Sequence, residues 1–328
     1  MLTDKLVSVV VACYKDEGSV SELLERLERV LGSITPNWEV IYVNDASPDN
    51  AEAVLLQKVK THPRLTVISH SRNFGAQVAF FTGMAQARGD AVVIMDGDIQ
   101  DPPEMIRDFA IKWLEGNEVV YGIRAKRAEN VVRRIGYYLF YRLFRKLAYI
   151  DIPLDAGEFS LMDRRVVNVI LACPERDLLI RGLRAFAGFR QVGIPFFRPQ
   201  RFAGESTQSM LSYFMWAYKA ITSYSLAPLR MITTMSIFFT LFLIILSLVF
   251  ILLYISGKDA PHGFMTLAML ILGCSSVIMI SLGIIAEYLG RLFVEVKKRP
   301  QPVLRTIVND QRQDPLNWPG MVSEKADS

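Results

Sequence analysis

The sequence predicts an α/β fold with a mostly parallel sheet, followed by two long apolar helices. In the N-terminal third, short runs of β-branched and apolar residues alternate with helix-like stretches, a pattern typical of a parallel sheet covered on both faces. In the C-terminal third, two uncharged apolar stretches are each long enough to cross a bilayer. The chain therefore combines an α/β domain with a membrane-type segment.

Four apolar runs are the predicted strands, at residues 7–11, 38–43, 65–68 and 91–95, and a helix is predicted at 20–31. Polar residues follow directly after each run. Because the carboxyl ends of parallel strands meet at one edge, where ligands bind in such sheets, we expect a binding site there. The residues at these ends are Asp16 with Glu17, Asp45, Arg72, and Asp96 with Asp98.

The net charge of +4 hides an uneven distribution. Residues 1–120 contain 11 Lys and Arg against 18 Asp and Glu, a net charge of −7, whereas residues 121–230 contain 18 against 8, a net charge of +10. The basic segment is expected to contact anions, which can be nucleic acid, a phosphorylated substrate or lipid headgroups. Its aromatic run at 137–141 and the neighbouring apolar stretches favour a membrane surface over nucleic acid.

The chain lacks the sequence motifs of two large classes of nucleotide-binding protein. No G-x-G-x-x-G follows the first predicted strand and no G-x-x-x-x-G-K-[ST] occurs, which argues against a dinucleotide oxidoreductase and a P-loop NTPase. The three cysteines are too scattered for a disulfide framework or a zinc site. No role is assigned to the histidines, and His62 and His70 are expected at the surface.

The apolar stretches at 231–256 and 265–286 are predicted to be transmembrane helices that form a hairpin. Arg230 precedes the first, and four basic residues follow the second between 291 and 299. This charge bias predicts that both chain ends and the α/β domain are cytoplasmic, at the inner membrane. Residues 131–150 and 209–225 mix aromatic and polar or basic residues, so we expect helices that lie at the membrane surface.

The triplet Asp96-Gly97-Asp98 follows a predicted buried strand, with Gln100 close behind. Two carboxylates at this spacing can reach one Mg²⁺ or Mn²⁺ ion, which also accepts substrate phosphates as ligands. A D-x-D triplet alone is a weak motif, and its position after a buried strand gives it weight.

Several longer segments resemble one family in their order along the chain. They are VVVACYKDEGSV, VNDASPDN, SRNFGAQVAFFTGM, DGDIQDPPEMI, YGIRAKR, DAGEFSLMDRR, LLIRGLRAFAGF and RFAGES. Together they resemble family 2 glycosyltransferases that use polyprenyl phosphates. The chain departs from the family pattern at Ala12, at Lys15-Asp16 and at Asn44. It also has Thr207-Gln208 where the family has Lys-Tyr, which puts its phosphate contacts or its activity in doubt.

The resemblance implies a GT-A fold and a donor site for a nucleotide sugar. In the donor site, Asp45 would accept a nucleobase N–H, and Tyr14 and Arg72 would hold the base, beside Ala12, Asp16 and Asp96. A turn or helix cap is the alternative role for Asp45. Asp98 would bind a divalent cation (Mg²⁺ or Mn²⁺), with Asp96 and Gln100 as further metal contacts.

The resemblance also implies an acceptor site for a lipid phosphate. Arg201 is the first candidate for a phosphate contact and for a catalytic role, and Arg181 is the second. The further candidates are Arg124, Arg127, Arg198 and Ser206. Asp155 is the candidate catalytic carboxylate, either as a base or to position the acceptor, and a capping or salt-bridge role is its alternative. A phosphate monoester is already largely dianionic at neutral pH.

These expectations describe a membrane-bound inverting glycosyltransferase that moves a sugar from a nucleotide donor, with UDP favoured, to polyprenyl (undecaprenyl) phosphate. The predicted parts are a donor-binding half of the GT-A domain at 1–125, an acceptor-binding half with the interface helices at 126–228, the transmembrane hairpin at 229–290 and a cytoplasmic tail at 291–328. A homo-oligomer could form through the hairpin. Three alternatives stay open: a weakened enzyme that acts as a scaffold, a transporter subunit, and a processive polysaccharide synthase. The Q-x-x-R-W motif that is typical of such synthases is absent from this chain.

Overall fold

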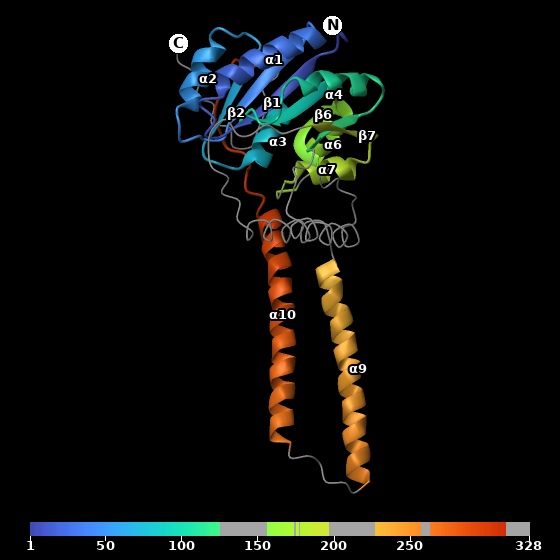
Figure 1. The fold of residues 1–328 in the computed structure, drawn as a ribbon. Coiled ribbons are helices and arrows are strands. Elements are labelled where there is room, and N and C mark those ends of the chain that lie inside the picture. The colour runs from blue at the N-terminus through green and yellow to red at the C-terminus, as the bar shows by residue number, and fades with distance from the viewer. Residues whose placement is uncertain (125–155, 174, 177, 197–226, 257–262, 313–328) are drawn as a thin grey trace. The chain divides into compact units, whose positions relative to one another are not determined.

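The computed structural model describes residues 1–124, 156–173, 175–176, 178–196, 227–256 and 263–312. These residues fall into two units (Figure 1). The α/β unit comprises the described residues up to 196 together with 299–312. The helical unit comprises the two long helices between them.

The described part of the α/β unit contains one sheet of eight strands in the order β7-β5-β6-β4-β1-β2-β3-β8. The strands are β1 (Val7–Cys13), β2 (Trp38–Asn44), β3 (Leu65–His70), β4 (Ala91–Asp96), β5 (Val119–Arg124), β6 (Ala156–Asp163), β7 (Gln191–Phe196) and β8 (Leu304–Val308). The first four agree with the predicted strands and extend each by one or two residues at its carboxyl end.

The sheet is mostly parallel, as predicted. β1 pairs in parallel with β2 on one side and β4 on the other, and β2 pairs in parallel with β3. β5 and β7 are also parallel to each other. The strand β6 runs antiparallel to both of its neighbours, and β8 runs antiparallel to β3. The carboxyl ends of β1 to β4 therefore lie at one edge.

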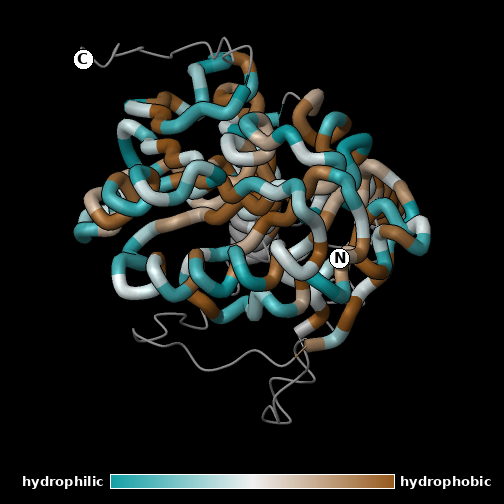
Figure 2. The backbone as a smooth tube through the Cα atoms, turned by 90° about the horizontal axis from the view of Figure 1, so that it is seen from above, coloured by the Kyte–Doolittle hydropathy of each residue, from teal (hydrophilic) through white to brown (hydrophobic). Residues whose placement is uncertain are grey.

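Helices cover both faces of the sheet (Figure 1). One face packs against α1 (Val20–Ile34), α2 (Ala51–Val59) and α4 (Met105–Leu114), and the other against α3 (Ala76–Gln86), α6 (Arg164–Ala172) and α7 (Ile180–Ala187). Leucines on one side of α1 are fully buried, while its other side carries charges. Hydrophobic and hydrophilic segments alternate along the chain (Figure 2). Because strand side chains alternate between faces, β1 supplies both cores.

The helical unit contains α9 (Ala227–Ile255) and α10 (Phe264–Lys297), which contact each other. Both apolar stretches predicted as membrane spans are helical. Within the described residues, the segment Gly273–Lys297 is long and apolar enough to cross a membrane, and α9 contains a shorter apolar stretch, Met231–Leu246. The predicted surface helices at 131–150 and 209–225 lie outside the described residues.

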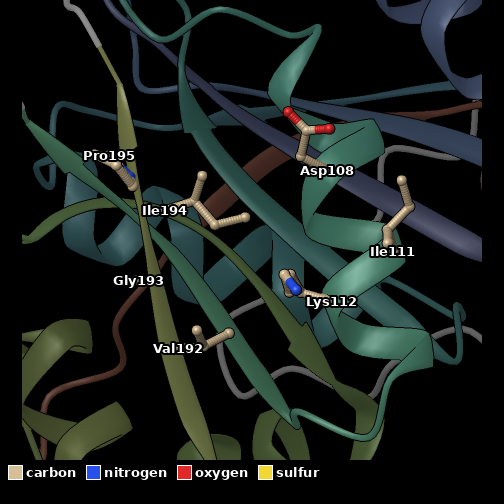
Figure 3. Close-up of a pocket in the computed structure, with 7 residues that line it drawn as sticks. All are labelled: Asp108, Ile111, Lys112, Val192, Gly193, Ile194 and Pro195. Carbon is tan, nitrogen blue, oxygen red and sulfur yellow. The ribbon is translucent and has the colours of Figure 1, made fainter.

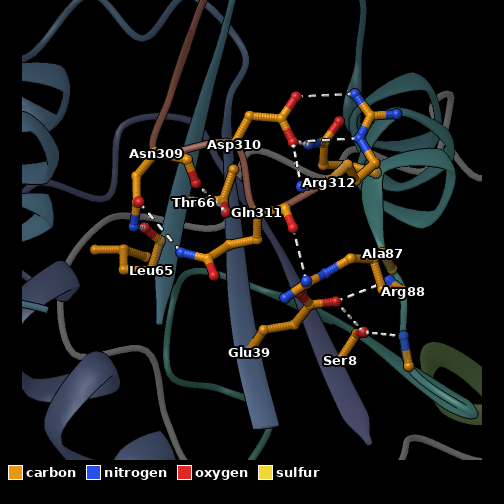
Figure 4. Close-up of polar contacts among 12 residues, drawn as sticks. Ser8, Glu39, Leu65, Thr66, Ala87, Arg88, Asn309, Asp310, Gln311 and Arg312 are labelled. Atoms are coloured by element: carbon orange, nitrogen blue, oxygen red, sulfur yellow. Dashed lines mark hydrogen bonds and ion pairs between the residues drawn. The ribbon is translucent and has the colours of Figure 1, made fainter. Parts of the chain in front are cut away.

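After α10 the chain rejoins the sheet as β8, which the sequence did not indicate. β8 pairs with β3 from Val67 opposite Val308 to His70 opposite Leu304, and the Leu304 side chain is buried in the α3 face of the core. Asn309 closes the junction: its Nδ2 donates to the carbonyl oxygen of Leu65 at 2.7 Å, and its carbonyl oxygen accepts from Thr66 Oγ1 at 2.9 Å (Figure 4).

An ion pair between a buried carboxylate and a partly exposed arginine ties the amino end of β2 to the end of α3. The Glu39 carboxylate accepts from Ser8 Oγ at 2.6 Å and from Arg88 Nε at 2.9 Å. Arg88 Nη1 donates to the carbonyl oxygen of Gln311 at 2.7 Å, which connects this network to the segment after β8 (Figure 4). The Glu39 side chain is 3% exposed, whereas that of Arg88 is 37% exposed.

We expect Leu304→Asp to release β8 from the sheet, because the substitution places a carboxylate in the apolar core. Backbone amides of β3 and β8 should then exchange with deuterium faster in the full chain. Arg305→Gln is the matched control, because the Arg305 side chain is half exposed and pairs with Glu52 at the surface, where an ion pair contributes about 0–1 kcal/mol. Unchanged protection of β3 in Leu304→Asp would show that β8 is not held by its core contact.

We expect Arg88→Ala to destabilise the α/β unit more than Glu39→Gln. The first change removes the cation from a carboxylate that is 3% exposed, and we expect it to cost about 2–3 kcal/mol. The second change leaves an arginine that water can reach and puts an uncharged amide in place of the carboxylate. We expect it to lower the free energy of unfolding by about 1–2 kcal/mol. The free energy of unfolding of each variant is measured by urea denaturation, with hydrogen exchange in the core strands as the readout. An equal or reversed order of the two losses in stability would contradict this explanation.

Candidate functional site

The loops after β1, β2, β3 and β4 meet at the predicted edge of the sheet. The strand register aligns Ala12 with Asp96 of β4, and Cys13 with Asn44 of β2. The backbone N–H of Asp45 donates to the carbonyl oxygen of Cys13 at 3.0 Å. Three neighbouring strands thus end at one level, and their loops begin side by side.

Gly97 joins the loops after β1 and β4. Its N–H donates to the Ala12 carbonyl oxygen at 2.9 Å, and its own carbonyl oxygen accepts from Ser19 Oγ at 2.6 Å. A Cβ atom at this position would lie 3.0 Å from both the Ala12 carbonyl oxygen and Asp16 Oδ2. Asp16 Oδ2 also accepts from the Tyr14 N–H at 3.0 Å. The structure therefore brings together Ala12, Asp16 and the Asp96-Gly97-Asp98 turn, and Tyr14 is exposed beside them.

The loops after β1 and β2 are joined by side chains that bind backbone N–H groups. The Lys15 N–H donates to Ser47 Oγ at 2.7 Å, and the Glu17 N–H donates to Asp49 Oδ2 at 3.0 Å. In return Glu17 Oε2 accepts from the Asn50 N–H at 3.2 Å. Burial alone would raise the pKa of Asp49, but hydrogen bonds from Ser47 and from backbone N–H groups lower it below its ordinary value. This carboxylate is therefore ionised at neutral pH.

Three loop residues adopt left-handed backbone conformations. They are Lys15, with φ of 62°, Ala46, with φ of 51°, and Ile99, with φ of 58°. Each follows a different strand, and none is a glycine, so each conformation costs of the order of 1 kcal/mol. Strain of this kind persists where the surrounding contacts impose it, and it gathers at ligand sites. Of the five non-glycine residues with a left-handed φ in the described part of the chain, three follow β1, β2 and β4, and the other two, Lys298 and Asn309, lie elsewhere.

Asp45 accepts hydrogen bonds from the loop after β3. Its Oδ1 accepts from the Phe74 N–H at 2.8 Å and from His70 Nδ1 at 2.8 Å, and its Oδ2 accepts from the Gly75 N–H at 2.7 Å. Burial would raise the pKa of Asp45, but these hydrogen bonds and the His70 ring lower it below its ordinary value. A carboxylate offers about four acceptor positions, so a contact with a base would add to three existing hydrogen bonds.

The prediction that His70 lies at the surface is wrong. β3 extends to His70, two residues beyond the predicted strand, and this extension places the ring in the interior with no exposed area. His70 Nε2 contacts Thr82 Oγ1 on α3 at 3.0 Å. Arg72, further along the loop, is exposed and stacks its guanidinium 4.5 Å from the Phe74 ring.

Asp96 and Asp98 are both partly exposed at the carboxyl end of β4. Asp98 Oδ1 accepts from the Gln100 N–H at 3.1 Å, and the Gln100 side chain is buried. Within the described residues no three His, Cys, Asp or Glu side chains are grouped so as to hold a metal. One or two carboxylates with substrate phosphates suit Mg²⁺ or Mn²⁺ better than a cage of protein ligands alone, so Asp96 and Asp98 fit a cation that arrives with a phosphorylated donor.

A second charged group lies between β6 and α7. Arg181 Nε donates to Glu158 Oε1 at 3.0 Å, so Arg181 is paired with a carboxylate that the sequence did not single out. Arg184, one turn along α7, is fully buried, and its guanidinium stacks 4.8 Å from the Tyr121 ring. Burial lowers the pKa of Arg184 to about 10. The spacing of the two arginines in the R-G-L-R segment was the available signal that they share one helix face.

The remaining predicted site residues lie outside the described residues. They are Asp155, Arg127, Arg198, Arg201 and Ser206, together with the side chain of Arg124. The departure from the family pattern at Thr207-Gln208 also lies outside them. The backbone of Arg124 ends β5.

A pocket of about 350 Å³ lies between α4 and β7 (Figure 3). It is lined by Asp108, Ile111, Lys112, Val192, Gly193, Ile194 and Pro195. None of these residues belongs to the loops after β1 to β4. The pocket is therefore separate from the candidate site.

Comparisons with known proteins identify the family of the chain. Residues 8–171 match the family model described as Glycosyl transferase family 2. The chain is 37% identical to "Uncharacterized glycosyltransferase YkcC" of Bacillus subtilis (strain 168), an alignment that covers 89% of the chain and 91% of that protein. It is 30% identical to "Prophage bactoprenol glucosyl transferase homolog" of Escherichia coli (strain K12), covering 92% and 99%.

A solved structure, "Mannosyltransferase PcManGT from Pyrobaculum calidifontis in complex with GDP-Man and Mn2+", is 18% identical to the chain. The alignment covers 90% of the chain and 87% of that structure, with a TM-score of 0.45. The assignment rests on the family match and on the two relatives, both of which are similar over nearly their whole length. The chain is a glycosyltransferase with a GT-A-like α/β fold and belongs to glycosyl transferase family 2.

Proposed function

We propose that the protein transfers a sugar from a nucleoside diphosphate donor to a polyprenyl phosphate at the cytoplasmic face of the inner membrane. The observation that carries the proposal is the joining of four strand-end loops at one edge, with Asp96 and Asp98 partly exposed among them. A UDP-linked sugar is the first donor to test. The name of the Escherichia coli relative, which specifies bactoprenol, supports the lipid acceptor.

In the donor site, the base would lie between Tyr14 and Arg72, which are both exposed beside the loops. Asp45 would offer its remaining acceptor position to a base N–H. Asp98, with Asp96 and Gln100, would hold a divalent cation against the donor phosphates. When bound, this cation supplies Lewis-acid stabilisation of the charge on the departing nucleoside diphosphate.

In the acceptor site, arginines would hold the lipid phosphate and aim one of its oxygens at the anomeric carbon of the sugar. The new bond forms from this oxygen while the bond to the donor phosphate oxygen breaks, which inverts the anomeric centre. The phosphate is largely dianionic at neutral pH and needs no strong base. The protein's main contribution is therefore positioning, with Arg201, Arg181 and Asp155 as candidate residues.

The helical unit would anchor the enzyme in the bilayer that contains its acceptor. Gly273–Lys297 has the length and composition of a span, and α9 supplies a second candidate. Both termini would be cytoplasmic. The alternatives, a scaffold whose transferase domain is inactive or a transporter subunit, predict no turnover.

The direct test is a transfer assay with the full chain in detergent, radiolabelled UDP-sugars and undecaprenyl phosphate, with and without Mn²⁺. The proposal predicts a labelled lipid that forms only when polyprenyl phosphate is present. A complete lack of transfer with every donor offered would overturn the enzymatic proposal and favour the scaffold.

We expect Asp98→Asn to reduce kcat by at least about 100-fold, because it removes a negatively charged cation ligand that stabilises the leaving group. Titration of Mn²⁺ in the presence of UDP should show weaker binding to the variant. Asp108→Asn is the matched control, because Asp108 is an exposed carboxylate on α4 away from the four loops. Full activity in Asp98→Asn would remove this residue from the metal site.

We expect Arg181→Gln to raise the KM for polyprenyl phosphate by about 10-fold, which corresponds to one charge-assisted hydrogen bond. The KM for the donor should change little. Arg190→Gln, at an arginine after α7 that the proposal does not use, is the control. An increase in the KM for the donor alone would show that Arg181 contacts the donor and not the acceptor phosphate.

A further inference from the structure

Three buried side chains form a continuous hydrogen-bonded chain beneath the candidate donor site. Asp45 follows β2, His70 ends β3 and Thr82 lies on α3. Their exposed fractions are 2%, 0% and 1%. His70 Nδ1 lies 2.8 Å from Asp45 Oδ1, and His70 Nε2 lies 3.0 Å from Thr82 Oγ1. The imidazole thus bridges a strand end and a helix across the core.

The partners of the ring determine where its protons lie. Thr82 Oγ1 lies 2.8 Å from the Val78 carbonyl oxygen, which can only accept, so the single hydroxyl proton belongs to that bond. The hydroxyl oxygen must then accept from His70 Nε2. Asp45 accepts from two backbone N–H groups and is ionised, so it must accept from Nδ1 as well. All of these contacts are satisfied together when both ring nitrogens carry a proton.

The ring also connects to the exposed part of the donor loop. Phe74 packs edge-on against His70, with ring centroids 5.5 Å apart and an interplanar angle of 89°. The Arg72 guanidinium lies over the Phe74 ring at 4.5 Å. Gly75, whose N–H donates to Asp45, has a φ of 93° and precedes α3. The His70–Asp45 pair thus fixes the loop from both its backbone and its aromatic side.

We propose that His70 is a positioning residue held as an imidazolium, which fixes Asp45 and, through it, the Arg72–Gly75 loop for donor binding. This role rests on the proposed function, in which the loop holds a nucleotide donor. The positive ring neutralises a buried carboxylate, so the loop keeps its shape without an ion from solvent. His70 contacts no reacting atom and acts only through Asp45 and Phe74.

Two amide substitutions separate the two ends of the ring. The side-chain nitrogen of asparagine is two bonds from Cβ, as Nδ1 is, and that of glutamine is three bonds away, as Nε2 is. His70→Asn therefore keeps a donor for Asp45, whereas His70→Gln keeps one for Thr82. We expect the KM for the UDP-sugar to rise at least about 10-fold in His70→Gln and less than about 3-fold in His70→Asn, with kcat nearly unchanged in both. Equal effects in the two variants would overturn the positioning role.

Two further measurements on the full chain do not depend on turnover. Hydrogen exchange at the Phe74 and Gly75 amides should accelerate in His70→Gln and stay near wild type in His70→Asn. In protein labelled with ¹⁵N-histidine, the His70 signals, assigned by their loss in His70→Asn, should show two protonated nitrogens, and a single protonated nitrogen would refute the imidazolium. If the wild type transfers no sugar while both results hold, the proposed function fails and the loop-positioning role of His70 stands.

Discussion

The parallel pairing of β1 with both β2 and β4 is the constraint on which the site depends. Because β1 lies between them in register, the Ala12 carbonyl oxygen faces Gly97, and the N–H of Asp45 faces Cys13. A slip of one residue in either pairing would turn the β1 side chains to the opposite core. The same burial that fixes the two cores therefore also fixes which loop residues become neighbours.

The acidic residues of the N-terminal third have a structural role in the loops that follow the strands. Asp45 and Asp49 each accept a backbone N–H from a neighbouring loop, and Asp16 accepts one from its own loop. These carboxylates replace water as partners for loop backbone groups that would otherwise be unpaired. The charges of these three carboxylates are thus stabilised by hydrogen bonds within the loops.

The strands that carry the candidate site could be predicted because each is encoded locally, by apolar runs such as residues 7–11 and by polar residues just after them. His70 could not be placed, because its burial depends on Asp45 and Thr82, which lie on other elements. The pairing of Arg181 with Glu158 likewise depends on how α7 packs against β6. The residues expected to bind the acceptor, Arg201 above all, remain predictions.

β8 was not predictable, because its five residues follow a long helix and carry no turn or repeat that marks an edge strand. It has a consequence for the order in which the protein is made. Thr66 bonds to Asn309 across 243 residues, so the edge of the sheet at β3 stays open until both long helices have left the ribosome. The sheet that carries the candidate site is therefore completed only by chain that is synthesised after the candidate membrane anchor.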